Sequence, residues 1–168
     1  MILYDYEYSH DLLLAQWWAR MREAGEFGRI FTKDLRPLGS FLAYFRPPRS
    51  LVFLTDAQGM WFAAWFEPVM SGAFAGLWLR PDYRRKKAGL EAVKSALELG
   101  LKRWPVLIGV TRKQELLRAH ERLGYTVLGE IPGLAEGEPT WIVVLTQEGF
   151  NGHGRQGRRR AITDQHNA

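Results

Sequence analysis

The feature that most constrains this chain is an apolar strand that leads directly into a dense basic cluster. Residues 73–79 are apolar, Pro81 turns the chain, and four consecutive basic residues follow at 84–87. Small and large apolar residues then recur with helical spacing, which predicts a helix over residues 84–102. A helix N-terminus offers unpaired backbone N–H groups and a partial positive charge, so basic side chains beside it predict an anion site, most naturally for phosphate. The alternative is a solvated basic helix start that binds nothing.

This stretch resembles the central motif of the GNAT acyltransferases, an apolar strand followed by Pro, an acidic residue, Tyr, Arg and then Gly-x-Gly-x-Gly at a helix start. The matching positions are Pro81, Asp82, Tyr83, Arg84, Lys86 and Gly89, whereas Arg85 and Lys87 replace two glycines. The resemblance implies a loop that binds the pyrophosphate of acetyl-CoA through backbone N–H groups. We expect Lys87 to be the most consequential replacement, because glycine allows close approach and positive φ. The cofactor-binding residues implied are Leu77, Trp78, Leu79, Arg84, Arg85, Lys86, Lys87, Ala88, Gly89 and Lys113.

A second stretch, residues 111–125, resembles the other cofactor motif of the GNAT family in its ending, Leu-Gly-Tyr. Lys113 stands where the family has Asn, and Leu116 where it has Ala. His120 stands where the family has the Tyr that usually protonates the departing CoA thiolate. Because histidine can act as a general acid near neutral pH, His120 is a candidate catalytic residue. The alternative is a packing residue with one satisfied hydrogen bond.

Acyl transfer to an amine also needs a base, and Glu67 is the first choice. Glu67 is expected at the end of a central strand, where its apolar neighbours Trp65, Phe66 and Val69 would raise its pKa if they desolvate it. The alternative is a strand-end charge beside Pro68. The sequence shows no Ser-His-Asp constellation and no metal-ligand spacing, and the absence of cysteine excludes disulfides, zinc thiolates and a cysteine nucleophile.

Periodicity along the chain predicts an α/β fold with a mixed sheet (α+β) in a single domain. Strands are expected at 2–8, 51–55, 60–66, 73–79, 106–111, 125–131 and 140–146, with helices at 10–24, 38–45, 84–102 and 113–123. This order is that of the GNAT fold, and the resemblance covers roughly residues 1–147. We expect 106–111 to be buried on both faces and to lie parallel to 73–79, with the two strands splaying near Pro81 to leave a cleft. The resemblance places an aromatic segment, Phe41, Tyr44 and Phe45, at the wall of the acceptor site.

Composition supports a globular domain with a distinct tail. Of 168 residues, 46% are hydrophobic and 24% charged, with a net charge of +5. We expect the domain to span residues 1–148 and residues 149–168, which hold four arginines, to form a flexible basic tail. The apolar stretch 60–79 contains Glu67 and Pro68 and is expected to form two strands instead of a membrane span. No secretory signal is evident, so a cytoplasmic location is expected.

The sequence thus predicts an acyl-CoA-dependent N-acetyltransferase that moves an acetyl group from acetyl-CoA to an amine acceptor. The alternative is a catalytically inactive GNAT-like structural or binding protein, such as the GNAT-like internal virion proteins of short-tailed phages, which would place it in a virion. Seven tryptophans leave room for a protein partner or a homo-oligomer. The tail suggests nucleic-acid binding only weakly, and steep salt dependence would be its sign.

Overall fold

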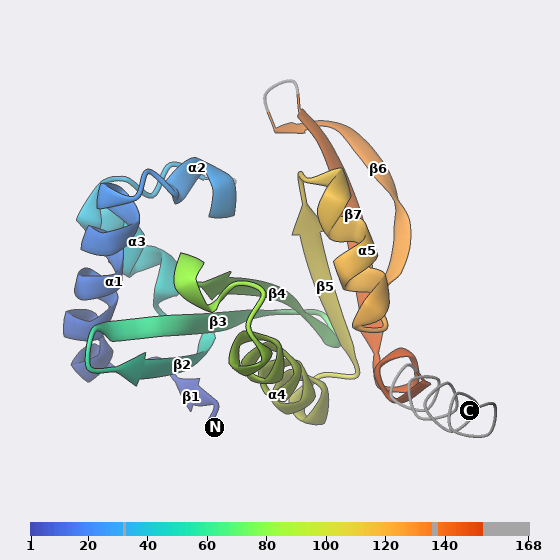
Figure 1. The fold of residues 1–168 in the computed structure, drawn as a ribbon, viewed down its shortest axis with the longest axis horizontal. Helices are drawn as coiled ribbons and strands as arrows, with labels where there is room; N and C mark the ends of the chain where they lie inside the picture. Colours follow the sequence, from blue (N-terminus) through green and yellow to red (C-terminus); the bar gives the residue numbers. More distant parts are fainter. Residues whose placement is uncertain (32, 136–137, 153–168) are drawn as a thin grey trace, which may run out of the picture. The chain divides into compact units, whose positions relative to one another are not determined.

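A computed structural model describes residues 1–31, 33–135 and 138–152 (Figure 1). The chain divides into two compact units, the first made of Met1–Val69 and Ala75–Gly100, the second of Met70–Phe74 and the chain from Leu101 onward. The strands are β1 (Tyr4–Asp5), β2 (Ser50–Asp56), β3 (Gly59–Val69), β4 (Gly72–Leu79), β5 (Val106–Thr111), β6 (Thr126–Ala135) and β7 (Glu138–Thr146). The helices are α1 (Asp11–Glu23), α2 (Phe27–Ile30), α3 (Leu38–Phe45), α4 (Lys87–Arg103) and α5 (Gln114–Arg122). Hydrogen bonds join the strands in the order β1-β2-β3-β4-β5-β7-β6.

The core of the first unit is aromatic. Strands β2 and β3 form an antiparallel hairpin in which Leu51 pairs with Trp65. Trp17 of α1 is 1% exposed, and its ring centroid lies 5.3 Å from that of Phe45 and 5.5 Å from that of Trp78. Helix α4 lies on the opposite face of β3 from α3 (Figure 1). Large rings therefore fill the space between α1, α3 and the strands and fix the end of β4, from which the candidate site begins.

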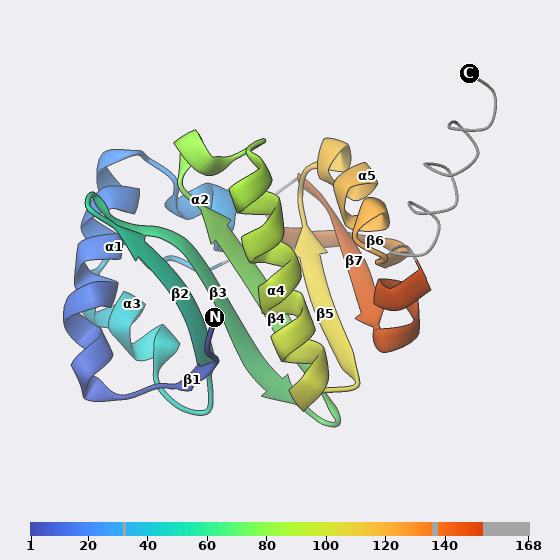
Figure 2. The same cartoon turned by 60° about the horizontal axis from the view of Figure 1, so that its bottom comes forward.

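The second unit contains the parallel pair that the sequence predicts. Ala73 and Phe74 at the start of β4 pair in parallel with Leu107 and Ile108 of β5, and β5 and β6 both pair antiparallel with β7. Strand β7 lies between β5 and β6, although it follows β6 in the chain (Figure 1), and Figure 2 shows β5 and β7 side by side. The expectation that β5 is buried on both faces is wrong, because burial alternates along it and Val110 is 38% exposed. The face of β5 that carries residues 107, 109 and 111 is buried, whereas the face that carries residues 106, 108 and 110 is partly exposed.

Several boundaries differ from those predicted. The first strand is limited to Tyr4–Asp5, because residues 8–10 form a 3₁₀ turn in which the backbone N–H of Glu7 donates to Nδ1 of His10 at 3.0 Å. Strand β3 continues to Val69, so Glu67 lies inside a strand and not at its end. The sequence also does not predict α2, a helix of four residues.

The tail expected from residue 149 begins differently, because residues 147–152 are helical. The remainder of that tail, 153–168, lies outside the described residues. No helix in the described part of the chain has the length and apolar character needed to span a membrane.

Candidate functional site

The candidate anion site is the loop that joins β4 to α4. Pro81–Tyr83 form a 3₁₀ turn, the N–H of Lys86 donates to the carbonyl of Tyr83 at 3.2 Å, and the N–H of Leu90 donates to the carbonyl of Lys86 at 3.2 Å. The helix thus begins at Lys87, three residues later than predicted. Within the described residues, the N–H groups of positions 87–89 donate no hydrogen bond, and the first turn of α4 contains no acid. Open donors and a helix dipole together suit an anion.

Two positions in this loop carry a conformational requirement. A Cβ at Gly89 would clash with the carbonyl oxygen of Tyr83, so only glycine fits there. Arg85 has φ of +70°, a conformation that glycine adopts without cost and arginine does not. Lys87, by contrast, is the first helical residue and has no positive φ. The expectation that a positive φ makes Lys87 the most consequential replacement is therefore wrong, since the strained backbone falls on Arg85.

The turn before the helix is fixed to the β2–β3 hairpin by a charged network. Arg80 contacts the carboxylate of Asp56 at 3.1 and 2.6 Å and that of Asp82 at 2.7 Å. The hydroxyl of Tyr83 donates to Asp56 at 3.0 Å, and the Tyr83 ring stacks on Trp61 with centroids 4.2 Å apart. The hydrogen bond from Arg80 lowers the pKa of Asp56 to about 2. The loop is thus held rigidly at neutral pH, where this carboxylate is ionised.

Arg84 is not a free cation of the cluster. Its guanidinium donates to the carboxylate of Glu26 and, through Nε, to the carbonyl of Leu79 at 2.9 Å. Glu26 is 4% exposed and also accepts a hydrogen bond from Nε1 of Trp78 at 2.8 Å. The cations left beside the open N–H groups are Arg85, Lys86 and Lys87, all of them exposed. The sequence did not reveal Glu26, because no local spacing connects it to positions 78 and 84.

The predicted strand residues before this loop take different orientations. Trp78 is buried with its ring against Trp17, whereas Leu77 and Leu79 are partly exposed. Their backbone role toward a cofactor stays a prediction.

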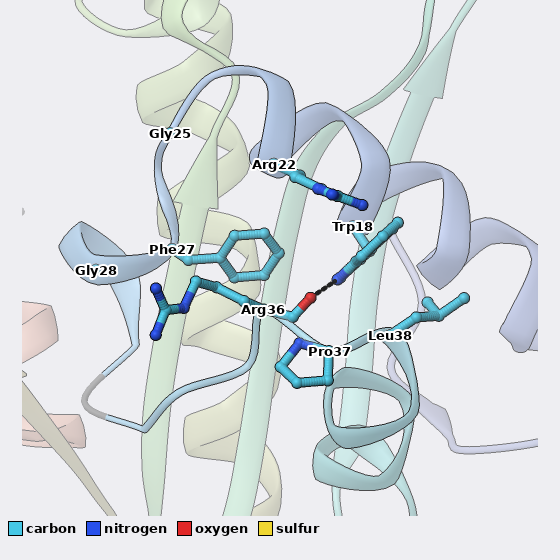
Figure 3. Close-up of a pocket in the computed structure, with 8 residues that line it drawn as sticks. All are labelled: Trp18, Arg22, Gly25, Phe27, Gly28, Arg36, Pro37 and Leu38. Carbon is cyan, nitrogen blue, oxygen red and sulfur yellow. Dashed lines mark hydrogen bonds between the residues drawn. The ribbon is translucent and has the colours of Figure 1, made fainter.

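Two pockets lie in the first unit, and the smaller one reaches Arg80 and Pro81 at the start of this loop. The larger, of about 630 Å³, is lined by Trp18, Arg22, Gly25, Phe27, Gly28, Arg36, Pro37 and Leu38 (Figure 3). The smaller, of about 370 Å³, is lined by Arg20, Glu23, Ala24, Glu26, Trp78, Arg80 and Pro81. The aromatic segment expected at an acceptor wall lines neither: Phe41 and Phe45 are fully buried in the core, where their side chains contact Trp17. Residues 24–28 contribute to both pockets instead.

Glu67, the candidate base, is ion-paired. Its carboxylate lies 2.6 Å from Nη2 of Arg49, and the Arg49 guanidinium also stacks over the ring of Tyr44 at 4.1 Å. The Glu67 side chain is 38% exposed, so its apolar neighbours in β3 do not remove it from water. To accept a proton from an amine, Glu67 would have to share its carboxylate with Arg49.

His120 and Lys113 belong to the second unit. The Nδ1 atom of His120 lies 2.8 Å from the carbonyl oxygen of Leu116, which can only accept, so Nδ1 carries the proton. The ring packs edge-on against Tyr125 at 5.2 Å, and desolvation lowers the pKa of His120. In the neutral ring, Nε2 therefore accepts a proton and does not donate one. Lys113 precedes α5, where its N–H donates to Oγ1 of Thr111 at 3.4 Å.

Comparison with known proteins identifies the fold. Neither a protein-family model nor a curated protein sequence matches the chain. Its structure is similar to that of an aminoglycoside 6'-acetyltransferase type Ii, with a TM-score of 0.67 and 18% identity over 87% of this chain and 97% of the other. It is also similar to the ribosomal-protein-S5-alanine acetyltransferase from Vibrio fischeri, with a TM-score of 0.68 and 11% identity over 88% and 93% of the two chains.

A third similar structure is the spermidine N-acetyltransferase from Vibrio cholerae in complex with CoA and spermine, with a TM-score of 0.63 and 10% identity over 89% and 96% of the two chains. The chain therefore has the mixed α/β fold of the GNAT acetyltransferases, as its two motifs predict. At these identities, the likeness concerns the fold.

Proposed function

We propose that this chain binds acetyl-CoA at the loop between β4 and α4 and transfers the acetyl group to an amine. The observation that carries the proposal is the start of α4, where three N–H groups are open, three exposed cations gather and the first turn of the helix holds no acid. A pyrophosphate suits this arrangement, because its charge is spread over oxygens that accept from successive N–H groups. The fold likeness to a CoA-bound acetyltransferase supports the same ligand.

The residues of the loop divide into binding and supporting groups. Lys87, Ala88 and Gly89 would bind phosphate oxygens through the backbone, and Arg85 and Lys86 would add charge. Arg84 would act indirectly, by tying the loop to Glu26. Leu77, Trp78 and Leu79 would offer backbone groups to the pantetheine arm, and Lys113 remains a proposed cofactor-binding residue.

The reaction moves two protons. The amine nitrogen attacks the thioester carbonyl carbon, the new C–N bond forms, the C–S bond breaks, and the sulfur leaves as a thiolate. The amine must lose a proton and the thiolate must gain one. Glu67 is proposed to take the first, and His120 to supply the second. His120 can do so only as an imidazolium, because its neutral ring keeps its proton on Nδ1, and its lowered pKa makes that form scarce at neutral pH.

A second candidate function is ligand binding without chemistry. This candidate is favoured because both proposed catalytic groups already have partners. Glu67 is ion-paired with Arg49, and Nδ1 of His120 donates to the carbonyl of Leu116. This candidate keeps the anion site and its supporting network but predicts no turnover.

One experiment separates the two candidates. Acetyl-CoA at a hundred times its dissociation constant should add about 2.7 kcal/mol to the free energy of unfolding, whereas inorganic pyrophosphate at equal ionic strength should add much less. Release of free CoA thiol in the presence of amines is then measured. Stabilisation with thiol release supports the transferase, and stabilisation without release for any amine supports the binding protein. If acetyl-CoA stabilises no more than pyrophosphate, the proposed function is wrong.

A further inference from the structure

The larger pocket of the first unit has an aromatic and apolar wall. Trp18 of α1 is partly buried, Phe27 is 7% exposed, and the exposed Pro37 and Leu38 extend the apolar surface. In Figure 3, the ring of Phe27 points toward Trp18 across the hollow. The volume of about 630 Å³ is within the range of small-molecule sites. The wall therefore suits a ligand with a ring.

The charge of this pocket is positive and unbalanced. None of the residues that line it is acidic. Arg36 already has an anionic partner, because its guanidinium donates two hydrogen bonds of 2.8 Å to the carboxylate of Asp34. It also points away from Trp18 (Figure 3). Arg22, by contrast, lies over the Trp18 ring at 5.3 Å and makes no ion pair with any described residue. One guanidinium is thus free to bind an anion.

The pocket is also connected to the proposed cofactor loop. Phe27 directly follows Glu26, whose carboxylate binds both Trp78 at the end of β4 and Arg84 of the loop. The backbone N–H of Glu26 donates to the carbonyl of Met21, which fixes this segment to α1. A ligand against Phe27 would therefore lie one residue from the side chain that anchors the loop.

We propose that this pocket binds an aromatic amine that carries one carboxylate, as an aromatic amino acid does. The role of this ligand as the acetyl acceptor rests on the proposed function. A planar guanidinium matches a carboxylate with two parallel hydrogen bonds, and its single charge balances a carboxylate better than a phosphate. The ring of the ligand would pack between Trp18 and Phe27. A polycation such as spermine does not suit the pocket, because no lining carboxylate would receive it.

The test uses ligands that differ by one group. Binding of L-phenylalanine, phenethylamine and spermidine to the full chain is measured by calorimetry without acetyl-CoA. Phenethylamine lacks only the carboxylate, so we expect it to bind about tenfold or more weakly than L-phenylalanine, as for a lost charge-assisted hydrogen bond. The variant Arg22→Gln should weaken L-phenylalanine binding by a similar factor. Arg20→Gln is the control, because Arg20 lies in the same last turn of α1 but lines the smaller pocket.

The outcomes separate this inference from the proposed function. If phenethylamine or spermidine binds as well as L-phenylalanine, or if Arg22→Gln and Arg20→Gln have equal effects, the pocket assignment is wrong even when acetyl-CoA binds. If L-phenylalanine binds through Arg22 but acetyl-CoA does not bind, the proposed function fails and the acceptor role fails with it, while the binding site stands. The third outcome is thiol release with L-phenylalanine as the acceptor. If Arg22→Gln reduces this release and Arg20→Gln does not, the result supports both the proposed function and the pocket assignment.

Discussion

Arg85 occupies a backbone conformation that its side chain does not favour. Its φ of +70° comes two residues before the start of α4, at a position where the resembling motif has glycine. For an L-residue the left-handed conformation costs about 1–2 kcal/mol. The loop keeps this geometry because the network of Arg80, Asp56 and Tyr83 on one side and the helix on the other fix its ends.

Replacing Arg85 with glycine or alanine separates backbone strain from charge. Both variants lose the guanidinium, but only glycine relieves the positive φ. We expect Arg85→Gly to have a free energy of unfolding about 1 kcal/mol higher than Arg85→Ala, measured by urea denaturation. Equal values for the two variants would show that the backbone at this position is not strained.

The segment between α1 and α2 is joined to β4 and to the cofactor loop by one buried carboxylate. Glu26 receives a hydrogen bond from Trp78 of β4 and another from Arg84 of the loop. Because Glu26 is 4% exposed, water cannot replace these donors. The elements around the candidate site are thus fixed by contacts between residues more than fifty positions apart in sequence.

Glu26→Gln tests this connection with little change of shape. The amide offers one acceptor oxygen to two donors, so one donor is left unpaired at a cost of about 1–3 kcal/mol in the free energy of unfolding. The control is Asp34→Asn, which breaks an exposed ion pair with Arg36 and should leave stability nearly unchanged. Chemical denaturation of both variants measures the difference, and a Glu26 variant as stable as the control would contradict the account.

Local pattern was sufficient for most elements of the fold. Helix α3 begins and ends where the sequence predicts, as does β5, because a proline pair follows the first and a helix stop precedes the second. The predicted start of α4 is three residues too early, since the basic residues 84–86 are good helix formers but Arg84 is held in the loop by hydrogen bonds to Leu79 and Glu26. Helix propensity is a local property of the sequence, so it cannot predict such tertiary contacts.

At the scale of the whole molecule, the sequence predicted the fold and the loop between β4 and α4, where the anion site is proposed, but not the contacts that the side chains of this loop make. The order of strands and helices and the two motifs were visible as local patterns. The pairings of Arg84 with Glu26 and of Glu67 with Arg49 were not, because they join residues that only folding brings together. The pocket around Trp18 was missed for the same reason: it combines the end of α1 with residues 36–38.

The central claim is that acetyl-CoA binds at the N-terminus of α4, and its most direct test compares the acetyl-CoA dissociation constants of Lys87→Glu and Lys94→Glu. Both variants make the same charge reversal on one helix, seven residues apart, and both lysines are exposed. A carboxylate in the first turn interacts favourably with the helix dipole, so Lys87→Glu should not unfold the protein. The same carboxylate would repel a bound pyrophosphate. We expect binding about tenfold or more weaker for Lys87→Glu and nearly unchanged for Lys94→Glu. Equal dissociation constants for the two variants would contradict the account.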